Sequence, residues 1–207
     1  MKKGTHFILN NNYEILLNDE KDITLSIISN GKTIYSVLVE PPSGGYGGGF
    51  LLLSPSEQYL VFSFYSGESE EAYQLFKIND CILESIFECD YLCGEGASYI
   101  FSDNEAVLIQ ALPESVGPWF TDDAMTDENE HPFFVYGKIN ILDIQKKTMH
   151  KHTLIVYPSD SWDNDMAEAE PFFISKVPEG HALHLIMPWG EEVLSLPLND
   201  TIIFRPE

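Results

Sequence analysis

The feature that most constrains the fold is a strand–turn–strand pattern that occurs twice in the chain, 48 residues apart. The segments "LLLSPSEQYLVF" (51–62) and "YIFSDNEAVLIQ" (99–110) align without a gap, so that Ser54 matches Ser102. The turns, Ser-Pro-Ser-Glu (54–57) and Ser-Asp-Asn-Glu (102–105), are rich in residue types that favour a tight reversal of the chain. Apolar, strand-forming residues flank each turn, and each segment is therefore predicted to be a β-hairpin.

Weaker copies of this hairpin lie near both ends of the chain, at 6–17 and 172–187. A second pair of strands is expected after each hairpin, and in the last unit this pair is 192–196 with 201–204. The whole chain, 1–207, is thus interpreted as a single domain of about four units, approximately 5–40, 49–89, 97–157 and 171–205. Four strands in roughly 40–50 residues are typical of a β-propeller blade.

The segment "LSPSEQYLVFSFYSGESEEAYQLFKI" resembles a blade of the WD40-like and TolB-like β-propellers, most strongly over residues 50–89. Those families favour Ser-Pro-Asp-Gly-Lys-Tyr-Leu-Ala-Phe between the first two strands. The matching residues are Ser54, Pro55, Tyr59, Leu60 and Phe62, whereas Ser-Glu replaces the Asp-Gly pair. The resemblance implies a fold and no activity, since propellers have many unrelated functions.

Composition supports the same fold class. Aromatic residues make up 13% of the chain, and long runs of Ala, Leu, Glu and Lys are scarce, which favours strands over helices. We therefore expect an all-β protein of four-stranded antiparallel β-meander units, arranged as a small or incomplete β-propeller. A twisted β-sandwich is the alternative.

The run "SGGYGGGF" (43–50) raises the question of a phosphate-binding loop. A dinucleotide fingerprint needs a third glycine where Phe50 stands, and a Walker loop needs Gly-Lys before Ser or Thr. The residues that follow are predicted to form a strand, so no helix N-terminus is available to bind an anion. The glycines are interpreted as a hinge that allows close packing.

The strongly negative net charge limits which classes of macromolecule the chain could bind. The chain has 33 Asp and Glu against 11 Lys and Arg, a formal net charge of −22, and its one arginine is Arg205. No lysine or arginine lies between Lys77 and Lys138. Such a field repels nucleic acid and anionic membranes and attracts basic partners, although acidity also simply favours solubility.

The expected location is the cytoplasm. No apolar run reaches the roughly 18 residues of a membrane span, and the apolar run 7–9 is too short for a secretory signal. The three cysteines, Cys81, Cys89 and Cys93, are an odd number and fit a reducing compartment.

No metal and no cofactor are expected. Cys89 and Cys93 lack a second pair of ligands for zinc, and the acidic segments lack the spacing of a calcium loop. His150 and His152 would share one strand face, and we interpret them as an exposed basic strand edge. Catalytic motifs such as a nucleophile elbow are missing, so a non-enzymatic role is favoured. A hydrolase-like enzyme with a carboxylate site in a propeller pocket is the alternative.

Two acidic stretches that contain tryptophan are the candidate partner-binding site. The first, near 113–131, is an insertion of about 18 residues in the second of the aligned units, and the second lies near 157–171. The candidate residues are Trp119, Asp122, Asp123, Asp127, Glu128, Glu130, Trp162, Asp163 and Asp165. Exposed tryptophan beside carboxylates would anchor and steer a basic protein, although each tryptophan could instead pack its loop onto the core. The most concrete form of this hypothesis is a toxin-neutralising immunity protein.

Overall fold

A computed structural model of the chain describes residues 2–19, 22–40, 47–65, 70–93, 97–113, 125–157, 173–176, 182–187 and 189–205. All regular elements in these ranges are β-strands, as the composition predicts. They fall into two compact units, Met1–Cys93 and Gly94–Glu207. Within the described ranges, no helix has the length and apolar character needed to cross a membrane.

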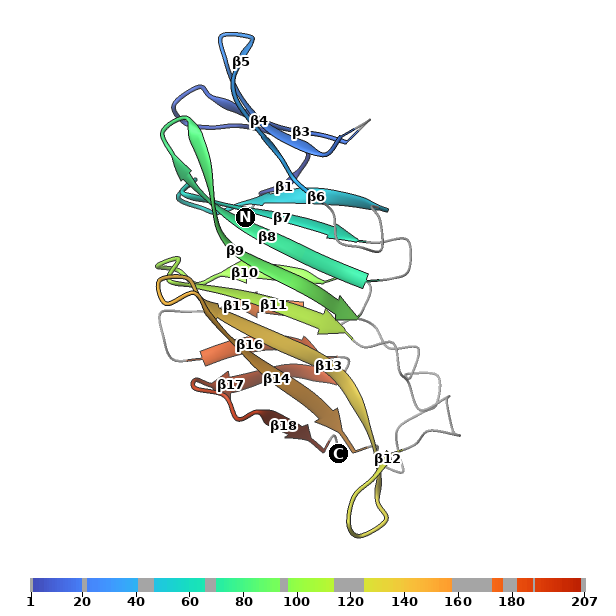
Figure 1. The fold of residues 1–207 in the computed structure, drawn as a ribbon. Helices are drawn as coiled ribbons and strands as arrows, with labels where there is room; N and C mark the ends of the chain where they lie inside the picture. Colours follow the sequence, from blue (N-terminus) through green and yellow to red (C-terminus); the bar gives the residue numbers. More distant parts are fainter. Residues whose placement is uncertain are drawn as a thin grey trace. The chain divides into compact units, whose positions relative to one another are not determined.

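The first unit contains two antiparallel sheets (Figure 1). One is the meander β2 (His6–Ile8), β3 (Glu14–Asn18), β4 (Thr24–Ser29) and β5 (Lys32–Leu38). The other is the meander β6 (Gly48–Leu53), β7 (Tyr59–Tyr65), β8 (Glu70–Asn79) and β9 (Ile82–Cys93). The N-terminal strand β1 (Lys2–Gly4) extends this second sheet beside β6. The predicted four-stranded meanders are confirmed here.

The second unit also contains two sheets. Its larger sheet has the order β10 (Ser98–Phe101), β11 (Val107–Pro113), β13 (Pro132–Asp143), β14 (Thr148–Val156) and β18 (Thr201–Phe204). The short strand β12 (Met125–Thr126) forms a hairpin with β13. A separate three-stranded sheet consists of β15 (Phe173–Lys176), β16 (Ala182–Met187) and β17 (Gly190–Ser195).

The last strand corrects one prediction, because 201–204 does not pair with 192–196. Instead β18 runs parallel to β14, with Thr153 opposite Thr201 and Val156 opposite Phe204 (Figure 1). The connection is fixed by a hydrogen bond of 2.8 Å from the Thr153 N–H to the Asp200 carbonyl. This position also buries Phe204 in the core beside Val156, which explains the preference for β14.

The two aligned turns have the same geometry. The Glu57 N–H donates to the Ser54 carbonyl at 3.0 Å, and the Glu105 N–H donates to the Ser102 carbonyl at 2.8 Å. Both glutamates have a positive φ, 61° and 54° respectively. The gapless alignment therefore matched structurally equivalent residues.

In each unit, the buried core consists of apolar side chains that alternate along the strands and face inward. In the first unit, Ile15 and Leu25 from one sheet belong to the same buried cluster as Leu60 from the other. In the second unit, Ile139 and Leu185 from its two sheets share a buried cluster. Each unit is thus two sheets packed over an apolar interior.

The glycine run leads into a strand. Gly48, the first residue of β6, has a φ of 149°, and a Cβ built on it would lie 2.5 Å from the Tyr65 Oη. A side chain at this position is therefore excluded by the backbone conformation and by the Tyr65 ring. This close approach agrees with the hinge interpretation, while residues 43–46 lie outside the described ranges.

Candidate partner-binding hairpin

The candidate residues divide into two groups. Asp127, Glu128 and Glu130 are described, in the turn that joins β12 to β13. The remaining candidates, Trp119, Asp122, Asp123, Trp162, Asp163 and Asp165, lie outside the described residues. The structure therefore gives a local geometry for one acidic turn, which we call the acidic hairpin (125–133).

The acidic hairpin has a compact hydrogen-bonded turn. The Glu130 N–H donates to the Asp127 carbonyl at 3.0 Å, and the Asp127 N–H donates to the His131 carbonyl at 3.0 Å. Glu130 has a φ of 63°, as expected for a turn followed by a left-handed residue. The side chains of Glu128 and Glu130 are exposed. Two carboxylates are thus presented to solvent on an ordered turn.

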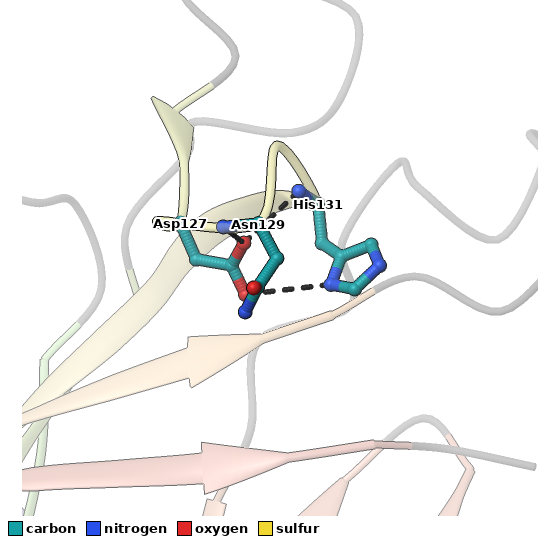
Figure 2. A network of polar contacts seen from close by, with 3 residues as sticks. All are labelled: Asp127, Asn129 and His131. Carbon is teal, nitrogen blue, oxygen red and sulfur yellow. Dashed lines mark hydrogen bonds and ion pairs between the residues drawn. The ribbon is translucent and has the colours of Figure 1, made fainter.

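Asp127 has a structural role that the sequence prediction missed. Its Oδ1 accepts hydrogen bonds from the Asn129 N–H at 2.8 Å and the His131 N–H at 3.0 Å (Figure 2). Its Oδ2 lies 3.5 Å from the His131 Nδ1, and its side chain is only 18% exposed. The signal that could have found this role is the position of Asp at the start of a turn, where its carboxylate can cap backbone N–H groups.

These contacts favour the ionised form of Asp127. The backbone hydrogen bond from His131 lowers the pKa of the Asp127 carboxyl most, with further lowering from the Asn129 N–H, from the charge of His131 and from the Tyr157 hydroxyl. Partial desolvation opposes this shift and raises the pKa. The net direction is downward, so the negative charge of Asp127 is retained well into the acidic range.

An aromatic cluster supports the acidic hairpin. The Tyr157 ring lies 5.7 Å from the Phe133 ring, between centroids, and the Tyr157 hydroxyl contributes to the lowered pKa of Asp127. The Arg205 guanidinium lies 3.9 Å from the centroid of the same tyrosine ring. None of these three supporting residues was among the sequence candidates, because they are distant from one another in the chain. The one sequence feature that could have pointed to this cluster is that the acidic chain has a single arginine, Arg205.

The described residues that flank both acidic segments lie at one end of the larger sheet. Pro113, which precedes residues 114–124, pairs with Gly137, and Gly137 pairs with Leu154 near the end of β14. Tyr157, which precedes residues 158–172, contacts Phe133 in the acidic hairpin. With adjacent strands about 4.8 Å apart, Pro113 and Leu154 are separated by roughly 10 Å. The described residues that precede the two acidic segments, Pro113 and Tyr157, therefore lie at the same end of the larger sheet.

Two residues that the sequence analysis considered as metal ligands, His152 and Cys89, have other surroundings in the structure. His152 is 6% exposed, and its Nδ1 lies 2.9 Å from the Asn199 carbonyl oxygen. The prediction of an exposed strand edge is wrong at His152, because β18 pairs beside β14 and its preceding connection covers this histidine. Cys89 is buried with 4% exposure. Among the residues that the structure describes, no group of three His, Cys, Asp or Glu side chains is arranged to hold a metal ion.

Comparisons with known proteins concern the fold. No family model matches the sequence, and no curated protein matches it. One similar solved structure comes from work on two prolyl endopeptidases, with 15% identity, a TM-score of 0.41, and coverage of 97% of this chain and 26% of that chain. Another is TolB from Acinetobacter baumannii, with 12% identity, a TM-score of 0.30, and coverage of 91% of this chain and 52% of that chain. This chain thus spans about a quarter and about half of these proteins, and such a weak likeness is one of fold alone.

Proposed function

We propose that this chain is a non-enzymatic binding domain that captures a basic protein at the acidic end of its second unit. The acidic end consists of the acidic hairpin with the flanking segments 114–124 and 158–172, neither of which contains a lysine or an arginine. The observation that supports the proposal best is that the described flanks of these segments, Pro113 and Tyr157, lie at the same end of the larger sheet as the acidic hairpin. A concentrated negative field of this kind steers basic proteins and accelerates their association.

The ordered turn adds to this support. Binding is favoured when the contacting groups are already held in place, because less conformational entropy is lost on association. The backbone bonds to Asp127 fix the path of the turn, so Glu128 and Glu130 project from a defined position. Trp119 and Trp162 would supply the aromatic anchors of the same surface. A toxin-neutralising immunity protein is the concrete form that we propose, with a basic toxin as the partner.

Affinity capture from a lysate of the source organism tests the proposal. The purified chain is immobilised, and captured proteins are identified after washing at about 50 mM and about 500 mM salt. We expect a basic protein that is retained at low salt and released at high salt, because screening shortens the range of surface charge. Recovery of no basic protein at low salt would contradict the proposal, as would a partner whose retention does not depend on salt.

A further inference from the structure

Arg205 occupies an unusual position for the single arginine of an acidic chain. It is exposed, yet its guanidinium lies over the Tyr157 ring, 3.9 Å from the centroid. The ion pairs within the described ranges are made by His6, His131, His184 and Lys146, and Arg205 is not among them. The guanidinium is thus held in the described structure by an aromatic face.

The Tyr157 ring is fixed by contacts that do not involve the arginine side chain. Its ring contacts Phe133 at a centroid separation of 5.7 Å. Its backbone N–H donates to the Phe204 carbonyl at 3.0 Å. The ring face would therefore keep its orientation if Arg205 moved away from it.

We propose that this face of Tyr157 is an arginine-binding subsite for the basic partner, and that Arg205 occupies it in the free chain. The inference rests on the proposed function and assigns Arg205 an autoinhibitory contact. A planar guanidinium stacks on an aromatic ring better than an ammonium does, so the subsite fits arginine rather than lysine. An incoming arginine replaces one stacked guanidinium with another and also meets the exposed Glu128 and Glu130 nearby.

A hexa-arginine peptide titrated by calorimetry at low salt tests this subsite. Arg205→Ala should bind the peptide about two- to fivefold more tightly than the matched variant Lys151→Ala, because an exposed cation–π contact must be broken only when Arg205 is present. Lys151 is an exposed residue of β14, and both variants lose one positive charge from the second unit. The double variant Arg205→Ala/Tyr157→Leu should lose the gain, and hexa-lysine should show a smaller gain than hexa-arginine.

The subsite is contradicted if Arg205→Ala binds hexa-arginine no more tightly than Lys151→Ala. A lower melting temperature of Arg205→Ala without tighter binding likewise overturns it, because Arg205 would then only fasten β18. If a basic partner is captured equally well by both variants, the subsite is wrong and the proposed function stands. If the peptide gain is found but no basic partner is captured, the subsite is upheld and the proposed function is wrong.

Discussion

At the scale of single residues, Gly48 shows how the backbone limits the sequence. A Cβ at this position meets the Tyr65 ring, and the φ of 149° disfavours any side chain. We expect Gly48→Ala to reduce the free energy of unfolding by about 1–3 kcal/mol from strain, with a further loss from displacing Tyr65. Gly190→Ala is the matched control, because its φ is 135° but no atom lies within 4 Å of the added Cβ. The free energies of unfolding of both variants are measured in urea. Equal losses in the two variants would contradict a contribution from the Tyr65 ring.

Asp127 leads to a prediction about acid stability. Its pKa is lowered in the folded chain, so its ionised form stabilises the fold above the unfolded pKa of about 3.9. That stabilisation is lost as the pH falls through the lowered folded value. Asp127→Asn keeps an oxygen that can accept the turn's N–H groups but cannot ionise. The wild-type advantage in melting temperature should therefore be fully present at about pH 6 and shrink as the pH falls below the unfolded value of about 3.9, and an advantage that does not change as the pH falls would contradict the assignment.

At the scale of elements, β18 tests the corrected strand pairing. Phe204 is 6% exposed within the core of the second unit, whereas its neighbour Ile203 is 54% exposed. Phe204→Ala should cost about 3–5 kcal/mol of unfolding free energy, because it leaves a cavity. Ile203→Ala should cost less than about 1 kcal/mol, since this side chain is half in solvent. Equal losses in urea unfolding would contradict the parallel pairing with β14.

Local patterns predicted most of the elements but missed the long-range partner. The turns at Ser54 and Ser102 are specified by their own residues, so alternation and turn chemistry were sufficient there. The partner of β18 depends on burial of Phe204 against strands far away in the sequence, and no local pattern encodes it. The cap by Asp127 and the contact between Arg205 and Tyr157 were missed for the related reason that charge alone suggested exposed, independent side chains.

At the scale of the whole molecule, the net charge of −22 attracts any basic protein, so a specific site must differ from the general field. The proposed site is the acidic end, where Glu128 and Glu130 are exposed on the acidic hairpin. Two other exposed carboxylates, Asp103 and Asp200, precede β11 and β18 at the opposite ends of those strands. Substitution of these two aspartates by lysine changes the net charge as much as the same substitution of Glu128 and Glu130, so it is the matched control.

The proposed site is tested by comparing the double variants Glu128→Lys/Glu130→Lys and Asp103→Lys/Asp200→Lys. Their association rate constants with the captured basic protein are measured by stopped flow at low salt. We expect charge reversal at the acidic hairpin to slow association by about tenfold or more, whereas the control should slow it no more than about twofold, because local charge complementarity governs the on-rate. Equal slowing by the two variants would show that only the overall charge matters, and it would contradict the proposed site.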